Sequence, residues 1–245
     1  SGVEIASYTG AIDPPLSIES HYNALDGCEI FDVGGHGVFL GDHLTGADDW
    51  STSFDPYKAE PHEFNQVTRC NIWQFGVVYK DAVGIWVSHT RDTLIANNEV
   101  SYGNWSGVSI GNLNKHEWVG PTCGGGFANW RRNTENTRVE HNYIHDVMLR
   151  LIDGGAIYST GAQVASSDGA ATVHGNYIQK VILNPYLNFR SENIVGTYFD
   201  QGSDGWRITG NFVQKVSHLF KFSSGTDPMA TQPINQGFGG GAWAV

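Results

Sequence analysis

Two aspartates stand in glycine-rich segments, where a carboxyl group can do acid–base chemistry. Asp153 opens the segment Asp-Gly-Gly-Ala-Ile-Tyr, and Asp200 lies within Tyr-Phe-Asp-Gln-Gly. Two carboxyl groups can act together in catalysis, one as a proton donor and the other as a base or nucleophile. An Asp beside glycines also forms turns by bonding its own backbone, so a structural role is the alternative for each. Acid–base chemistry and a structural turn are therefore the two interpretations of each aspartate.

Several further side chains are candidate contacts to a ligand. A histidine beside a strand can bond a sugar hydroxyl, an arginine can bind a carboxylate, and an exposed aromatic ring can stack on a sugar. Each of these types is also common in a purely structural role, as a bend histidine, a paired arginine or a solvated glutamate. The candidates are Trp86, His89, Tyr198, Arg190, Glu192 and His36.

The sequence carries none of the common signatures of a catalytic transition metal or a serine hydrolase. It has no His-Glu-x-x-His motif and no cysteine pair at zinc spacing, and it has no Ser-His-Asp signature at a Gly-x-Ser-x-Gly elbow, since the one segment with that spacing, Gly107-Val-Ser-Ile-Gly, is a copy of an internal repeat. We therefore expect no cofactor. Structural calcium stays open, because calcium takes oxygen ligands from flexible loops. Two segments contain several aspartates that could supply such oxygen ligands: Asp48, Asp49 and Asp55 in one, and Asp200 and Asp204 in the other.

Composition limits the fold class and the partners. The formal net charge is −11 with 14 Lys and Arg, so we expect no nucleic acid partner. No apolar run of about 18 residues occurs, so we expect no membrane span, and no leader opens the chain unless one was trimmed before Ser1. Charged residues are only 16% and glycines number 31, which favours short strands joined by turns. We expect one all-β domain over residues 1–245.

Two short segments alternate along the chain as internal repeats. The first has a polar residue, a variable residue and then Ile or Val, and the second starts with Gly and alternates apolar residues. Near-identical strands stacked in register place equal side chains about 4.8 Å apart, so a recurring Asn can form a hydrogen-bonded ladder. The pattern predicts a single right-handed parallel β-helix, a solenoid, rather than an antiparallel sandwich. The copies start at Cys28, Cys70, Asn98, Asn142, Asn176 and Asn211, and at Gly37, Gly84, Gly107, Gly155 and Gly196.

The repeat also makes predictions for single positions. Cys28 and Cys70 take the same slot of successive copies, so their Cα atoms should lie near the ~4.4 to 6.8 Å that a disulfide requires. Asp146 in Ile-His-Asp-Val repeats the place of Asp32 in Ile-Phe-Asp-Val, which predicts a structural turn at both.

Long intervals between copies predict inserted loops. In a solenoid, insertions on one side often wall a binding groove, although they can also cap its flanks. The loops are rich in aromatic residues, which fits a groove. They are expected at about residues 41–66, 112–136, 159–172 and 182–195, with Trp50, Tyr57, Trp118, Trp130 and Tyr186 among them.

Alternation along the Gly-led strands predicts which side chains face outward. Each Gly-led strand has two outward positions, two residues apart. Stacking of the strands aligns equal positions, so each of the two forms a column of side chains along the solenoid. Asp200 then shares its column with small residues only, so we expect it to be open to water and to be the ionised member of the pair. The first column holds Phe39, Trp86, Ser109, Ile157 and Tyr198, and the second holds Gly41, Ser88, Gly111, Ser159 and Asp200.

The two acidic segments and the repeated Asn-Tyr-Ile resemble the parallel β-helix proteins of carbohydrate metabolism. The likeness is strongest to β-helix glycoside hydrolases that act on cell-wall polysaccharides. It implies that Asp153 and Asp200 form the catalytic pair in an outer groove, that the partner is a carbohydrate, and that the protein is secreted, periplasmic or at the cell surface. Members of that family are usually longer, so the chain is a short member or a fragment.

Two other functions remain alternatives to a glycoside hydrolase. A polysaccharide lyase would need Lys or Arg beside a uronic acid, and none stands in the strand columns. A non-catalytic solenoid for carbohydrate binding or assembly would carry no paired acids on its outer columns.

Overall fold

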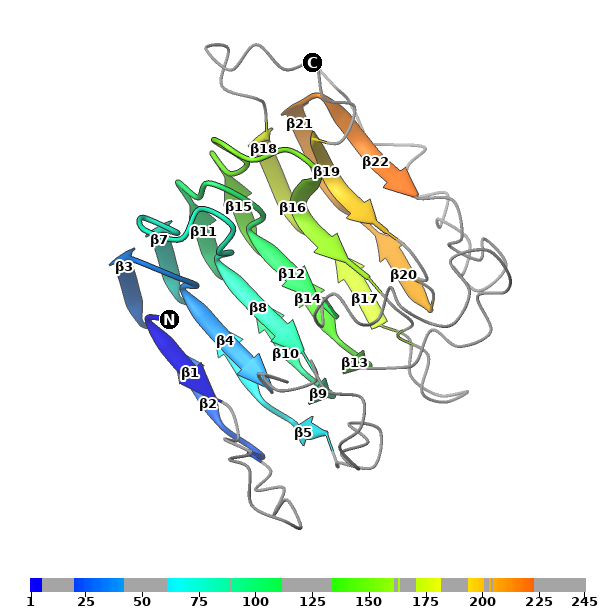
Figure 1. The fold of residues 1–245 in the computed structure, drawn as a ribbon. Helices are drawn as coiled ribbons and strands as arrows, with labels where there is room; N and C mark the ends of the chain where they lie inside the picture. Colours follow the sequence, from blue (N-terminus) through cyan, green and yellow to red (C-terminus); the bar gives the residue numbers. More distant parts are fainter. Residues whose placement is uncertain are drawn as a thin grey trace, which may run out of the picture.

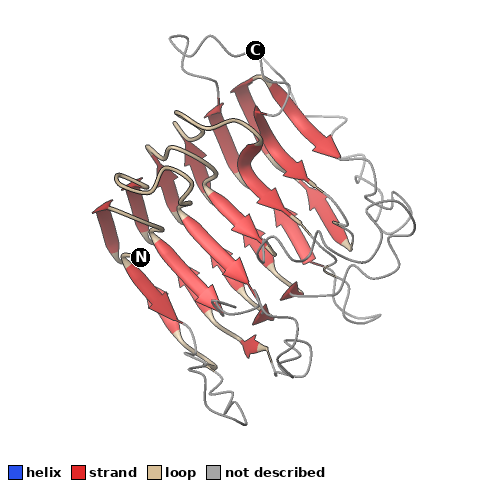
Figure 2. Cartoon of the chain, in the orientation of Figure 1, coloured by secondary structure: helices blue, strands red, loops and turns tan. Residues whose placement is uncertain are grey.

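The structure is a computed structural model. It describes residues 1–5, 20–41, 61–88, 90–111, 134–160, 163, 171–181, 194–200, 203 and 205–222. In these ranges the regular elements are all strands, as Figure 2 shows, and no helix that could span a membrane occurs there. The prediction of an all-β chain is confirmed.

Three parallel sheets contain most of the strands (Figure 1). Sheet A has β1 (Val3–Ile5), β4 (Val38–Gly41), β8 (Ile85–Ser88), β12 (Val108–Ile110), β16 (Gly154–Ser159), β19 (Ile194–Phe199) and β22 (His218–Phe222). Sheet B has β2 (Ala24–Asp26), β6 (Gln66–Thr68), β10 (Leu94–Ala96), β14 (Arg138–Glu140), β17 (Ala171–His174) and β20 (Trp206–Thr209). Sheet C has β3 (Glu29–Val33), β7 (Asn71–Phe75), β11 (Glu99–Ser101), β15 (Tyr143–His145), β18 (Tyr177–Val181) and β21 (Phe212–Val216).

The chain passes through these sheets in a fixed order. It runs from sheet B to sheet C to sheet A, as in β2–β3–β4 and β6–β7–β8, and then begins again in sheet B. Each strand pairs in parallel with the strand of the next passage, for example Ile30 with Ile72 and Ile72 with Val100. The predicted register of the polar-led copies is therefore confirmed.

A ladder of asparagines runs through the interior at the start of sheet C. The Nδ2 atom of Asn98 donates to Asn142 Oδ1 at 2.9 Å, Asn142 donates to Asn176 at 3.0 Å, and Asn176 donates to Asn211 at 2.9 Å. Each Nδ2 also donates to a backbone carbonyl of sheet B, such as Ile95 O from Asn142. Buried amides cost free energy unless they are bonded, and the stacking of identical residues satisfies them. The predicted ladder is confirmed.

The apolar core is one cluster with side chains from all three sheets. Val38 and Ile85 of sheet A, Ile95 of sheet B, and Ile72 and Ile144 of sheet C belong to it and are fully buried. Burial of one such side chain stabilises the fold by roughly 1.5–3 kcal/mol. The polar-led and Gly-led copies thus each supply one wall of the same core.

The bend between sheets B and C repeats one backbone conformation. At each passage one residue takes a positive φ of 54° to 66°, a region that only Gly adopts without steric cost. This position can be read from the structure but varies in the sequence: Gly27, Arg69, Asn97, His141, Gly175 and Gly210.

The register of β16 differs from the sequence prediction by one residue. Val108 pairs with Ile157, and Ile157 pairs with Thr197. Ala156, not Gly155, therefore follows Gly107, and a Cβ at Gly107 would lie 2.9 Å from Ala156 O. The segment has two glycines before its apolar residues, so the sequence pattern starts the copy at the wrong position.

This shift reverses the faces of three side chains. Ile157, predicted outward, belongs to the interior cluster, whereas Tyr158, predicted inward, lies with Tyr198 in a separate cluster outside it. Ser159 faces the interior, where it accepts a hydrogen bond from Trp206 Nε1 at 3.2 Å. Because side chains alternate between the two faces of a strand, an error of one residue moves all of them.

Most of the predicted loops lie outside the described residues, including Trp50, Tyr57, Trp118, Trp130 and Tyr186. At the ends of these segments the structure has a small parallel sheet of β5 (His62–Glu63), β9 (Thr90–Arg91) and β13 (Thr134–Glu135). Residues 62–63 and 134–135 had been expected in loops, so those loop boundaries are wrong by a few residues.

Cys28 and Cys70 precede paired positions of β3 and β7, since Glu29 pairs with Asn71, and both are free thiols. The Cys28 thiol is one of the groups acting on Cys70, whose pKa is raised first by burial. We expect diamide to oxidise this pair to an intramolecular disulfide in the folded protein, seen as a cross-linked peptide by mass spectrometry. Cys28→Ser is the control. If both thiols still react with an alkylating agent after diamide treatment, Cys28 and Cys70 do not lie side by side on neighbouring strands.

Candidate functional site

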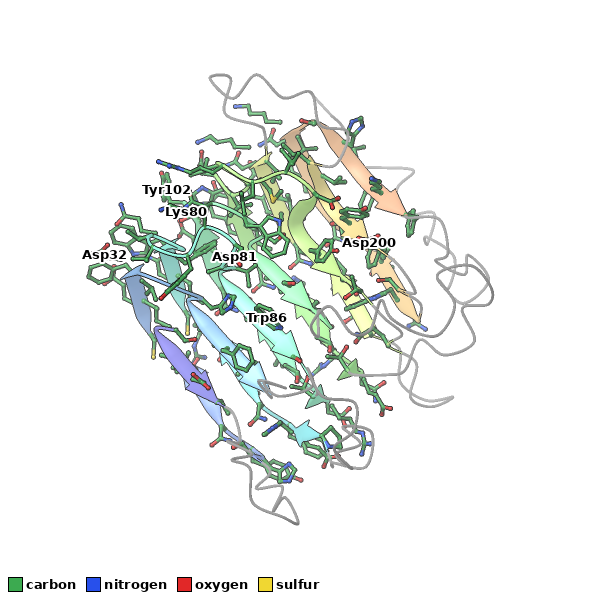
Figure 3. The ribbon with its side chains drawn as sticks, in the orientation of Figure 1. Asp32, Lys80, Asp81, Trp86, Tyr102 and Asp200 are labelled. Carbon is green, nitrogen blue, oxygen red and sulfur yellow. The ribbon has the colours of Figure 1, made fainter. Side chains whose placement is uncertain are left out.

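The outer face of sheet A carries a row of aromatic side chains. Strand pairing aligns one position from each of seven strands, and four of the seven are aromatic. This aromatic row confirms that Trp86 and Tyr198 share a face, and Figure 3 places Trp86 and Asp200 on this sheet. In order, the row is Glu4, Phe39, Trp86, Ser109, Tyr158, Tyr198 and Lys221.

Trp86 and His36, two predicted ligand contacts, touch each other. Their ring centroids lie 4.5 Å apart in an edge-to-face arrangement, and Phe39 packs 5.8 Å from the Trp86 ring. The Nδ1 atom of His36 accepts a hydrogen bond from the Val83 amide at 3.0 Å, which orients the imidazole. Trp86 stays partly exposed. This end of the row can therefore offer a ring surface to a ligand.

Tyr158 links the aromatic row to an acid. Its hydroxyl donates a hydrogen bond of 2.8 Å to Asp200 Oδ2, and both side chains are buried. Burial, then the carboxylate of Asp200, and then that of Asp153 raise the pKa of the Tyr158 phenol far above its usual range. The phenol therefore stays protonated at any physiological pH and remains a hydrogen-bond donor. Both predicted catalytic carboxylates act on this one hydroxyl.

Asp153 occupies a strained and crowded place before β16. It is exposed and has a φ of 68°, and its carbonyl accepts a hydrogen bond from Trp105 Nε1 at 3.1 Å. A Cβ at Gly154 would lie 2.6 Å from that same indole nitrogen, so only glycine fits there. The Trp105 ring lies 6.0 Å from the Tyr158 ring. The Asp153 carbonyl thus lies beside Trp105 at the start of β16, whereas Asp200 lies beyond the end of β19.

Two predictions about exposure are wrong. Tyr198 is on the predicted face but only 3% exposed, because the Tyr158 ring packs against it at 5.3 Å and Lys221 Nζ lies 4.7 Å from its centroid. Asp200 is only 5% exposed and is not open to water. Its amide donates to Ser159 O at 2.8 Å, which sets it beside Thr160, so Thr160 and not Ser159 belongs to its column.

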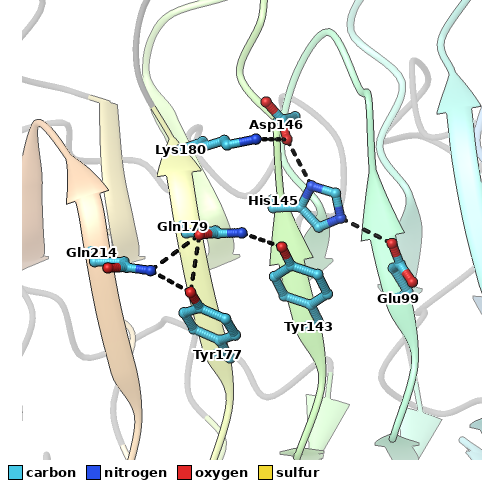
Figure 4. Close-up of polar contacts among 8 residues, drawn as sticks. All are labelled: Glu99, Tyr143, His145, Asp146, Tyr177, Gln179, Lys180 and Gln214. Atoms are coloured by element: carbon cyan, nitrogen blue, oxygen red, sulfur yellow. Dashed lines mark hydrogen bonds and ion pairs between the residues drawn. The ribbon is translucent and has the colours of Figure 1, made fainter.

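The outer face of sheet C holds a second polar cluster, drawn in Figure 4. His145 contacts Asp146 Oδ2 through Nδ1 at 2.7 Å and Glu99 Oε1 through Nε2 at 3.0 Å, and Lys180 bonds the same Asp146 oxygen at 3.2 Å. Asp146, just after β15, has a φ of 50°, and Asp32, within β3, has a φ of 54°, so both share a left-handed backbone conformation, although Asp32 lies in a strand and not in a turn. These contacts link neighbouring strands to one another.

Other predicted site residues lie outside the described residues. These are His89, Arg190 and Glu192, together with the acidic residues Asp48, Asp49, Asp55 and Asp204 considered for calcium. Within the ranges that the structure describes, no three His, Cys, Asp or Glu side chains gather as a metal site. The roles predicted for these residues stay predictions.

Tyr158 and Trp105 are site residues that the sequence prediction missed. Tyr158 was placed in the core by the register error, although aligning it with Tyr198, instead of aligning the glycines, gives the correct pairing. Trp105 lies just before the Gly-led strand β12, outside both repeated segments. No feature of the repeat points to it.

Comparisons with known proteins give one informative likeness. No family model matches the sequence, and no curated protein matches it. A solved structure resembles the fold with a TM-score of 0.62 at 19% sequence identity. That protein is a glycoside hydrolase. The alignment covers 86% of this chain but only 34% of that protein, so the chain spans about a third of its neighbour. At this identity the likeness concerns the fold.

Proposed function

We propose that this chain is a right-handed parallel β-helix that acts as a glycoside hydrolase on a poly- or oligosaccharide. The observation that carries the proposal is the Tyr158 hydroxyl, which bonds Asp200 and is influenced by the Asp153 carboxylate. Glycoside hydrolysis needs two carboxyl groups that reach one bond, so this proposal requires the Asp153 side chain, which precedes β16, to extend toward Asp200 beyond the end of β19. The repeated order of sheets and the similar glycoside hydrolase fold support the assignment.

The two aspartates have different surroundings, which suits different roles. Asp200 is buried and accepts the phenolic hydrogen bond, which orients its carboxylate for the role of nucleophile or base in this proposal. Asp153 is exposed, and it serves as the acid in this proposal. A carboxyl separation of about 5–5.5 Å would mean retention of configuration and about 6.5–9.5 Å inversion.

The aromatic row supplies the sugar-binding surface in this proposal, with Trp86 as its partly exposed ring. We expect Trp86→Ala to weaken oligosaccharide binding about three- to tenfold with little change in melting temperature, because the ring lies outside the core. Trp73→Ala is the matched control, since Trp73 stacks on Phe31 on sheet C. If Trp86→Ala unfolds the protein instead, its assignment to the outer face is wrong.

The experiment that tests the function is an assay of product chemistry on neutral and uronic-acid polysaccharides. A hydrolase releases reducing ends and no unsaturated sugar. A lyase also yields an unsaturated uronic acid, which is seen by its ultraviolet absorbance. Binding with neither product would instead favour a non-catalytic carbohydrate-binding solenoid. Secretion, periplasmic location or cell-surface attachment belongs to the same proposal, because a cell-wall polysaccharide lies outside the cytoplasm.

A further inference from the structure

The outer face of sheet A contains buried polar atoms without partners. Ser88 Oγ, Ser109 Oγ, Thr160 Oγ1 and Trp86 Nε1 are shielded from solvent, and none has a hydrogen-bond partner in the part of the chain that the structure describes. The exposed fractions of the three hydroxyl residues are 0%, 1% and 5%. A buried polar group without a partner destabilises a protein by about 1–3 kcal/mol. A ligand with polar groups could supply the missing hydrogen bonds on this face.

These atoms lie together on neighbouring strands. Ser109 pairs with Trp86 in the aromatic row, and Ser88 stands two residues beyond Trp86 on the same side of β8. Thr160 N bonds Ile110 O and Gly111 N bonds Val87 O, which places Thr160 and Ser88 on either side of Gly111. The three hydroxyls and the indole N–H therefore form one patch over β8, β12 and β16, which we call the hydroxyl patch.

The hydroxyl patch is a gap in the aromatic row. Ser109 takes the position between Trp86 and Tyr158, where the other inner positions of the row are aromatic. Strands lie about 4.8 Å apart, so the backbones carrying the two flanking rings are about 10 Å apart. Gly111 adds no side chain to the patch. Of the four groups, Trp86 alone keeps part of its surface exposed, so a ligand would enter along this ring.

We propose that the hydroxyl patch is a subsite that binds one uncharged glycosyl unit of the substrate. Sugar hydroxyls both donate and accept hydrogen bonds, and so do the patch hydroxyls, while Trp86 donates. Asp200, which stands beside Thr160 in the same column, would repel a uronic acid or a sulfated sugar. No Lys or Arg stands in either outer column from β4 to β19 within the described residues. The inference rests on the proposed function and names its substrate class.

The test measures binding in a variant that cannot cleave the ligand. In the Asp153→Asn protein, which keeps the Asp200 carboxylate, calorimetry with neutral hexasaccharides of glucose, xylose and galactose should show binding to at least one, and hexagalacturonate should not bind. Ser109→Ala should weaken that binding about three- to tenfold, and Ser88→Ala/Ser109→Ala/Thr160→Val about thirtyfold or more. The melting temperature should not fall, because each change removes an unbonded buried hydroxyl. If a hydroxyl had a structural role instead, its removal would lower the melting temperature and leave the affinity for the hexasaccharide unchanged.

Thr197→Val is the matched control. Thr197 Oγ1 is also buried on sheet A and has no partner among the described residues, but it faces the interior beside Ile157, so binding should not change. Equal binding by the triple variant, or binding of hexagalacturonate alone, overturns the subsite. Because the readout is binding, the subsite stands if the native protein binds through these hydroxyls but cleaves nothing. The proposed hydrolase function stands if the native protein cleaves a polysaccharide but the hydroxyl substitutions leave its affinity unchanged.

Discussion

Replacing Asp200 by Asn should abolish cleavage of any polysaccharide that the native protein hydrolyses, and the folded state should persist. The loss expected for a general acid or base is roughly 10²- to 10⁴-fold in kcat, and it is larger for a nucleophile. Asn keeps the size of the side chain and an oxygen that can accept the Tyr158 hydrogen bond, so packing around the 2.8 Å contact survives. Asp153→Asn should have a similar effect. Initial rates of reducing-end release, beside circular dichroism spectra, provide the measurement.

The control for these variants is Asp32→Asn. Asp32 is exposed at a bend of sheet C, and its φ of 54° is one that Asn adopts readily. Figure 3 labels it far from Asp200 along the sheets. Its rate should equal that of the native protein. Retention of activity by both Asn variants at the candidate pair would remove the catalytic assignment and favour a binding module.

Tyr158→Phe separates the role of the phenol from that of the acids. It removes the donor to Asp200 and leaves the ring in contact with Tyr198 at 5.3 Å. We expect lower kcat with KM nearly unchanged, because the hydroxyl orients Asp200 and does not bind substrate. The pH–rate profile should also change, because the substitution removes the hydrogen bond that the phenol donates to the Asp200 carboxylate. An unchanged profile would show that the contact is structural only.

The repeat itself could be predicted because every copy meets the same physical requirement. Each passage buries a polar residue at the start of sheet C, and the bonded asparagines satisfy one another, so Asn recurs at 98, 142, 176 and 211. The Gly-led strands recur because a Cβ would meet the carbonyl of the next strand, as at Gly84, where it would lie 2.6 Å from Gly107 O. Requirements shared by neighbouring strands are visible in one sequence.

The candidate site depended on features that a repeat does not encode. Two glycines precede Ala156, so either of two registers fits the pattern, and the choice decides whether Tyr158 reaches Asp200 or the core. The burial of Asp200 and Tyr198 depends on which side chains stand beside them on adjacent strands. The small residues in the Asp200 column suggested that its carboxylate is accessible to water. The Tyr158 side chain, which belongs to the neighbouring column, instead covers the carboxylate and bonds it.

Asn142→Ala should destabilise the fold more than any other single truncation proposed here. Asn142 is buried, and its Oδ1 accepts bonds from the backbone and side-chain nitrogens of Asn98 at 3.0 and 2.9 Å. Its Nδ2 donates to Ile95 O and Asn176 Oδ1. Removal leaves several buried groups unbonded, which costs about 3 kcal/mol or more. For a chain of this size the melting temperature should fall by roughly 6–12 °C.

Asn71→Ala is the matched control, because Asn71 has the same side chain but lies on the partly exposed outer side of sheet C, next to the slot of Cys70. It should change the melting temperature by only a degree or two, as is usual for surface substitutions. Thermal and urea unfolding followed by circular dichroism compare the two variants. Equal stability would mean that the ladder adds no net free energy and that the core of Val and Ile side chains alone holds the strands in register. A much larger loss at Asn142 would show that the stacked amides fix the register, which in turn sets Tyr158 beside Asp200.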